Sequence, residues 1–102
     1  MNAPAAVAPI ESNRLAANQA VLRGRILEVK RTESAVYTVL TLPAPDAYSK
    51  PQVVEIRSQR MIGKPNEDLT VRVSIGGYRR SYKDSHGETQ YATNIALTLA
   101  DE

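Results

Sequence analysis

Residues 69–99 read LTVRVSIGGYRRSYKDSHGETQYATNIALTL, two alternating apolar runs joined by a polar hairpin. The first run, 69–77, has the period of two that is typical of a β-strand with one buried face. The last run, 91–99, alternates in the same way. The side chains of the first run that we expect to point into a core are Leu69, Val71, Val73 and Ile75.

The segment between these runs has the composition of a long hairpin. Its tip, Asp84-Ser-His-Gly87, contains the Asx and Gly residues that a tight turn needs. The flanks 78–83 and 88–91 are expected to pair as extensions of the two strands. The double glycine Gly76-Gly77 is typical of a strand bulge rather than of a phosphate-binding loop. The stretch as a whole predicts an extended β-hairpin.

Upstream, β-branched and aromatic residues gather in three further runs, 20–30, 35–42 and 52–58. In the first run the alternation changes phase near Gly24, which favours a bent or bulged strand. A proline-rich loop joins the second and third runs. The connector 59–68 is too short and too broken for a long helix, although one helical turn would fit.

Five strands in about eighty residues, without a convincing helix, favour a small β-barrel, because closure removes exposed strand edges. SH3-like barrels satisfy the same pattern, so the residues alone leave the exact fold open. Residues 1–18 are rich in Ala, Pro, Asn and Ser and predict a flexible arm. We therefore expect one folded domain over 19–102.

Charge and composition narrow the classes of function. The chain of 102 residues has a net charge of only +2, but all thirteen Lys and Arg lie between Arg14 and Lys83, a span with six acids. The body of the chain is therefore basic. With no cysteine and a lone histidine, His86, we expect neither a metal site nor a cofactor. No catalytic set or Walker loop occurs, so we expect no catalytic residues and no enzyme activity.

At this point the chain resembles the single-stranded DNA-binding protein family of bacteria, phages and plasmids. The resemblance covers residues 20–99 and lies in the opening strand 21–26 and in the order of strand, glycine, basic and aromatic hairpin, and strand over 69–97. Trp and Phe are absent and the chain is short, which fits a phage or plasmid member better than a cellular one. The resemblance implies an all-β, five-stranded OB-fold barrel with an extended hairpin between its last two strands.

Binding of single-stranded DNA without sequence choice requires cations along the phosphate path and flat side chains for stacking. Tyr78, Arg80 and Tyr82 share one face if the alternation persists, and Arg79 faces the other way. Tyr91 is expected at a buried rim. The alternative without a ligand is that Tyr78 packs on the barrel rim and the charged side chains only form a solvated face of the hairpin. The candidate nucleic-acid contacts are Arg23, Arg25, Tyr37, Arg57, Arg72, Tyr78, Arg79, Arg80, Tyr82 and Lys83, with Arg23, Arg25, Arg57 and Arg72 lining one groove.

The expected partner is single-stranded DNA during replication or recombination. Replication proteins are expected as further partners. A small barrel with few aromatics also predicts a homo-oligomer, a dimer first and a tetramer second. We expect no membrane-spanning segment and a cytoplasmic location, in a bacterial cell or a phage-infected host. Two alternatives stay open: an OB-fold protein-interaction module of a replication or primosome assembly, and an RNA-binding OB module.

Overall fold

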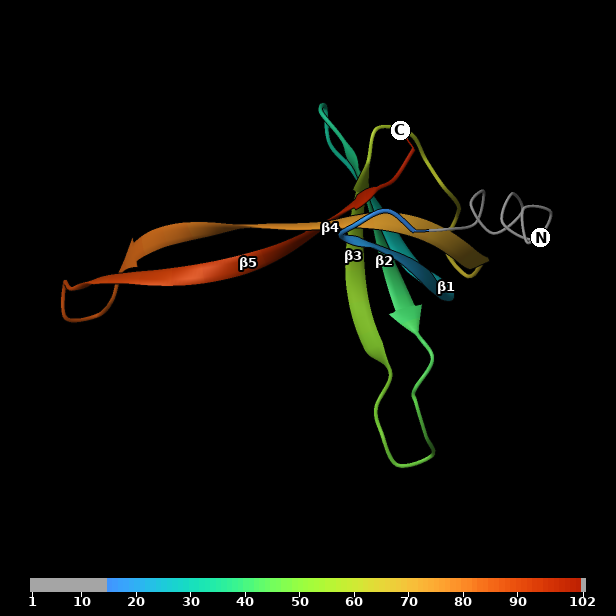
Figure 1. Ribbon diagram of the computed structural model, residues 1–102, viewed down its shortest axis with the longest axis horizontal. Coiled ribbons are helices and arrows are strands. Elements are labelled where there is room, and N and C mark those ends of the chain that lie inside the picture. Colours follow the sequence, from blue (N-terminus) through green and yellow to red (C-terminus); the bar gives the residue numbers. More distant parts are fainter. Residues whose placement is uncertain (1–14, 102) are drawn as a thin grey trace, which may run out of the picture.

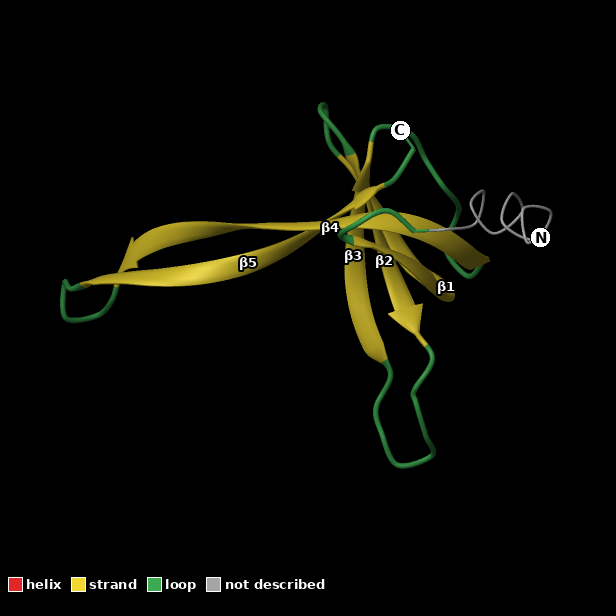
Figure 2. Ribbon diagram, in the orientation of Figure 1, coloured by secondary structure: helices red, strands yellow, loops and turns green. Residues whose placement is uncertain are grey.

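The computed structural model describes residues 15–101, and within them every regular element is a strand (Figure 1, Figure 2). The connector 59–68 contains no helical turn. The flexible N-terminal segment predicted from the sequence covers residues 1–18, of which 1–14 lie outside the described residues. The five strands are β1 (Gln19–Arg31), β2 (Val36–Leu42), β3 (Gln52–Ser58), β4 (Asp68–Lys83) and β5 (Thr89–Leu99). The all-β prediction with five strands is confirmed.

The strands pair in a closed ring in the order β1-β2-β3-β5-β4, and β4 pairs back to β1. All neighbours are antiparallel except β3 and β5, which run parallel and share only two register pairs, Ile56 with Leu97 and Arg57 with Thr98. This seam between β3 and β5 is the shortest pairing in the ring, so the two strands separate on either side of it.

β4 is long enough to serve two purposes. Its first half pairs with β1 as far as Ser74, which lies opposite Gln19. From Val73 to Lys83 it pairs with β5 in an uninterrupted antiparallel register, so no bulge occurs at the double glycine. Beyond the end of β1 the two strands continue alone and project far from the ring (Figure 1). We call this projection, residues 76–96, the arm; it is the extended hairpin that the sequence predicts.

The core lies inside the ring and draws on four strands. Ile26, Leu40, Ile56 and Val73 are fully buried, and burial of each side chain contributes about 1.5–3 kcal/mol. Ile75 was expected in this core, but 43% of its surface is exposed. The prediction was wrong there because β1 has no residue left to cover β4 beyond Ser74.

β1 changes partners where its sequence has a glycine. Gly24 is the last residue before the strand begins to pair with β2 as well as β4, and a Cβ at this position would overlap the carbonyl oxygen of Thr41. The irregularity itself lies between Ile26 and Glu28, not near Gly24 as predicted. There the Ile26 amide donates to the carbonyl of Glu67 in the connector, at 2.9 Å.

Candidate nucleic-acid interface

A groove of about 670 Å³ opens beside the seam between β3 and β5. Tyr37 of β2 and Arg57 of β3 are cross-strand partners on its outer wall, and Arg57 in turn pairs with Thr98 of β5. Tyr78 enters from the root of the arm and is 57% exposed. The groove is lined by Tyr37, Val54, Glu55, Arg57, Tyr78, Ile95, Ala96, Leu97 and Thr98.

The arm extends this groove on one of its two faces. Strand alternation places Tyr78, Arg80 and Tyr82 together, and we call these three residues the groove-side face of the arm. The Arg80 guanidinium carbon lies 5.5 Å from the centre of the Tyr82 ring, and its Nε donates to Asn94 Oδ1 at 3.0 Å. The predicted sharing of a face by Tyr78, Arg80 and Tyr82 follows from the observed register.

Asn94 is a positioning residue that sequence reasoning missed. It lies opposite Tyr78 in the register of the arm, which brings its amide to Arg80. The signal was present in the turn, because pairing Lys83 with Thr89 across the tip fixes every later pair. Counting back from that turn would have placed Asn94 on the groove-side face.

The opposite side of the arm, which we call the far face, carries Arg79, Ser81, Lys83 and Tyr91. The Arg79 guanidinium carbon lies 4.6 Å from the centre of the Tyr91 ring. Tyr91 was expected at a buried rim, yet it is 60% exposed. That expectation was wrong because the register places Tyr91 opposite Ser81, well outside the ring.

The tip of the arm is held by a carboxylate. Oδ1 of Asp84 accepts hydrogen bonds from the backbone amides of His86 at 2.8 Å and Glu88 at 3.0 Å, and Oδ2 accepts one from Gln90 at 3.1 Å. The hydrogen bond from Glu88, followed by that from Gln90, lowers the pKa of the Asp84 carboxyl. Gly87 has a φ of 79°, a conformation that a residue without Cβ adopts at no steric cost. These contacts fix the turn from which the arm takes its register.

Ion pairs divide the candidate cations into two groups. Arg25 contacts Asp68 at 2.9 Å, and the hydrogen bond and charge of Arg25 lower the pKa of that carboxyl. Arg72 lies 4.0 Å from Asp101. Within residues 15–101, the predicted cations that have no carboxylate within 4.0 Å are Arg23, Arg57, Arg79, Arg80 and Lys83. The cations available to phosphates are therefore those of the groove and the arm, together with Arg23 on β1.

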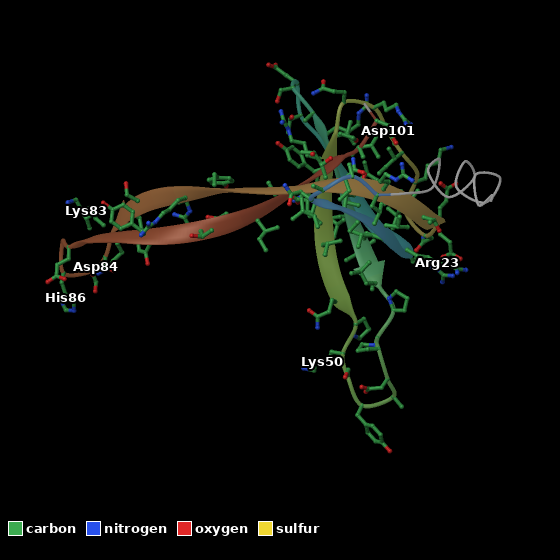
Figure 3. All side chains as sticks on the ribbon, in the orientation of Figure 1. Arg23, Lys50, Lys83, Asp84, His86 and Asp101 are labelled. Carbon is green, nitrogen blue, oxygen red and sulfur yellow. The ribbon has the colours of Figure 1, made fainter. Side chains whose placement is uncertain are left out.

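The predicted single groove for four arginines does not form. Arg23 and Arg25 line a separate hollow of about 360 Å³ beside the proline-rich loop, and Arg72 lines a third of about 260 Å³. Only Arg57 reaches the groove at the β3–β5 seam. Figure 3 shows Arg23 on the side of the molecule away from Lys83 at the arm's end. The reason is that Arg23 and Arg25 lie on β1, and Arg72 lies on the part of β4 that pairs with β1, whereas β1 borders neither β3 nor β5 in the ring.

Two other features are absent from residues 15–101: a cluster of metal-ligating side chains and a membrane-spanning helix. No three or more His, Asp or Glu side chains in this range gather as a metal site would require. Nor does this range contain a helix of the length and apolarity needed to cross a membrane.

Comparisons with known proteins find a relative in sequence and a likeness in fold. A DNA-binding protein of Escherichia phage If1 is 36% identical over 61 residues, which cover 56% of this chain and 64% of the phage protein. The chain therefore spans slightly less than two thirds of that relative. It resembles the phage-type single-stranded DNA-binding proteins. This confirms the resemblance predicted from the strand and hairpin pattern. No protein-family model matches the chain.

A structural likeness supports the same fold. The mitochondrial single-stranded DNA-binding protein Rim1 of S. cerevisiae matches with a TM-score of 0.60, over 85% of this chain and 93% of its own. The two sequences are only 11% identical, so this likeness concerns the arrangement of the strands alone.

Proposed function

We propose that this chain is an OB-fold protein that binds and protects single-stranded DNA without sequence choice, in replication or recombination. The observation that carries the proposal is one continuous surface, which begins in the groove with Tyr37 and Arg57 and continues along Tyr78, Arg80 and Tyr82. We therefore propose that the DNA path includes these five of the ten predicted residues. The phage relative, which is named a DNA-binding protein, supports it independently.

The chemistry of this surface suits unpaired bases. Tyr78 and Tyr82 are four residues apart on one strand, so their rings are spaced by about 13–14 Å. This is about four times the 3.4 Å rise between stacked bases in one DNA strand. Each tyrosine therefore meets a different base, while Arg80 contacts the phosphates between them and Arg57 contacts phosphates inside the groove. Stacking contributes about 1–3 kcal/mol per base whatever the base is, which explains binding without sequence choice.

We further propose that the protein is a binding protein and not an enzyme, and that it acts in the cytoplasm of a bacterial cell or a phage-infected host beside replication proteins. We infer a homo-oligomer, dimer before tetramer. The homo-oligomer is supported by an apolar side chain exposed where the arm leaves the ring, Ile75, which is 43% exposed. Light scattering should give twice or four times the monomer mass at micromolar concentration; a monomer would contradict the oligomer.

The decisive test is anisotropy of a labelled dT oligonucleotide titrated with protein at two salt concentrations. Tyr82→Ala should weaken binding by about 5- to 140-fold, which corresponds to the loss of one stacked base. Tyr48→Ala is the matched control, because Tyr48 is 99% exposed on the loop between β2 and β3, outside the groove and the arm. Equal affinity of both variants and the wild type would remove the groove-side face from the site.

Competitors identify the ligand class. Unlabelled dT should displace the probe, whereas duplex DNA should not, because paired bases cannot stack on the tyrosines. An RNA oligonucleotide of the same length decides between the DNA and RNA readings, since stacking and cations alone do not separate them. Absence of binding at low salt would refute the proposed function.

A further inference from the structure

The far face of the arm repeats the pairing of arginine and tyrosine found on the groove-side face. Arg79 stacks over Tyr91 at 4.6 Å, as Arg80 stacks over Tyr82 at 5.5 Å. Tyr91 is 60% exposed, so its ring is as accessible as those of the groove-side tyrosines. Because neighbouring residues of a strand point to opposite sides of a sheet, the two pairs stand back to back on the arm.

The charges around Tyr91 favour a polyanion as its ligand. Arg79 and Lys83 lie on this face, and among residues 15–101 neither has an ion-pair partner; Lys83 donates a hydrogen bond to Thr89 Oγ1, at 2.8 Å. The paired segments 76–83 and 89–96 contain no Asp or Glu. A strand of phosphates would therefore meet no repulsion along the arm before the turn at its tip.

The polar neighbours of Tyr91 disfavour a protein partner for this half of the face. Its surroundings are Ser81, Thr93 and two cations, whereas the centres of protein interfaces are depleted of charge. The exposed apolar side chain of the same face that lies nearer the ring is Ile75. A second copy of the chain would contact the part of the far face next to the ring. The outer part of the far face, with Arg79, Lys83 and Tyr91, is then left for nucleic acid.

We propose that the far face is a second single-strand site, in which a base stacks on Tyr91 and phosphates contact Arg79 and Lys83. This rests on the proposed function of the groove-side face. A strand on one face reaches the other only by passing around the edge of the arm. One protomer therefore holds two strand segments at once, one on each face, and can bridge two strands without a second protomer.

The test uses the absence of tryptophan from the chain. Tyr91→Trp and Tyr82→Trp each introduce a single fluorescent reporter, one on each face. Titration with a dT hexanucleotide should quench both reporters, because a base stacked on the indole quenches its emission. At saturation, native mass spectrometry should count two hexanucleotides per protomer, a ratio that does not depend on oligomeric state.

Alanine variants then separate the faces. Tyr91→Ala should reduce the count to one hexanucleotide per protomer and leave quenching of the Tyr82→Trp reporter unchanged, and Tyr91→Phe should restore the count to two. Circular dichroism of each variant checks that the fold is intact. One hexanucleotide per protomer in the wild type, with the Tyr91→Trp reporter unquenched, would overturn the second site while leaving the first intact. No quenching of either reporter would refute both.

Discussion

Gly24 offers a sharp test of how the ring closes. The strand β1 passes so close to β2 here that a Cβ on Gly24 would overlap the carbonyl oxygen of Thr41 and lie 3.1 Å from Cγ of Leu40. The carbonyl belongs to a paired strand, so it cannot move away without shifting β2. Gly24→Ala therefore forces the two strands apart at the point where β1 changes partners.

The expected cost follows from this overlap. Inserting a methyl group into a closely packed site costs about 1–3 kcal/mol, occasionally more, and the backbone contact places Gly24→Ala at the upper end, about 3 kcal/mol. Gly76→Ala is the matched control, since its Cβ would meet only the Ala96 carbonyl oxygen, at the ordinary distance of 3.8 Å. There the lower entropy of the unfolded chain stabilises by about 0.4–1 kcal/mol.

Urea denaturation followed by circular dichroism measures both free energies of unfolding. Gly24→Ala should lower the midpoint with an unchanged m-value, and Gly76→Ala should leave it equal or slightly higher. In thermal unfolding, 3 kcal/mol corresponds to a decrease in Tm of about 12–24 °C for a domain of this size. Equal midpoints for the two variants would refute the close approach of β1 and β2.

Three other predictions concern the candidate site. Arg57→Ala should reduce the slope of log affinity against log salt by about 0.7. Arg25→Ala should change this slope less, because Arg25 is already paired with a carboxylate and lies in a different hollow. Equal changes of slope in the two variants would contradict the proposed path. The Asp84 carboxyl has a lowered pKa, so its stabilisation of the turn is present above pH 3.8 and is lost as the pH falls through that lowered pKa. In NMR, the chemical shift of the Glu88 amide proton should titrate with a midpoint below pH 3.8. A midpoint at or above pH 3.8 would contradict the hydrogen bonds to this carboxylate. Gly77→Ala places a Cβ 2.7 Å from a backbone oxygen of β5, so it should disturb the arm and weaken dT binding while lowering the unfolding midpoint of the ring less than Gly24→Ala does.

Local sequence determined most of the secondary structure. The period of two over 69–77 and 91–99, the turn residues Asp84 and Gly87, and the order of arginines and tyrosines between them predict the hairpin and its two faces. These features depend on neighbours within a few residues, because alternation and turn conformation are properties of the backbone itself.

Tertiary structure alone decided which of these side chains are buried and which meet. Ile75 and Tyr91 have the alternation of core residues but are exposed, because the ring ends where β1 ends and no strand covers them. Tyr37 and Tyr78, distant in the chain, meet in one groove only through the pairing around the β3–β5 seam, whereas Arg23 lies in another hollow. A periodic pattern assigns a face to each residue, but the partner that covers or extends that face depends on how the strands close on one another.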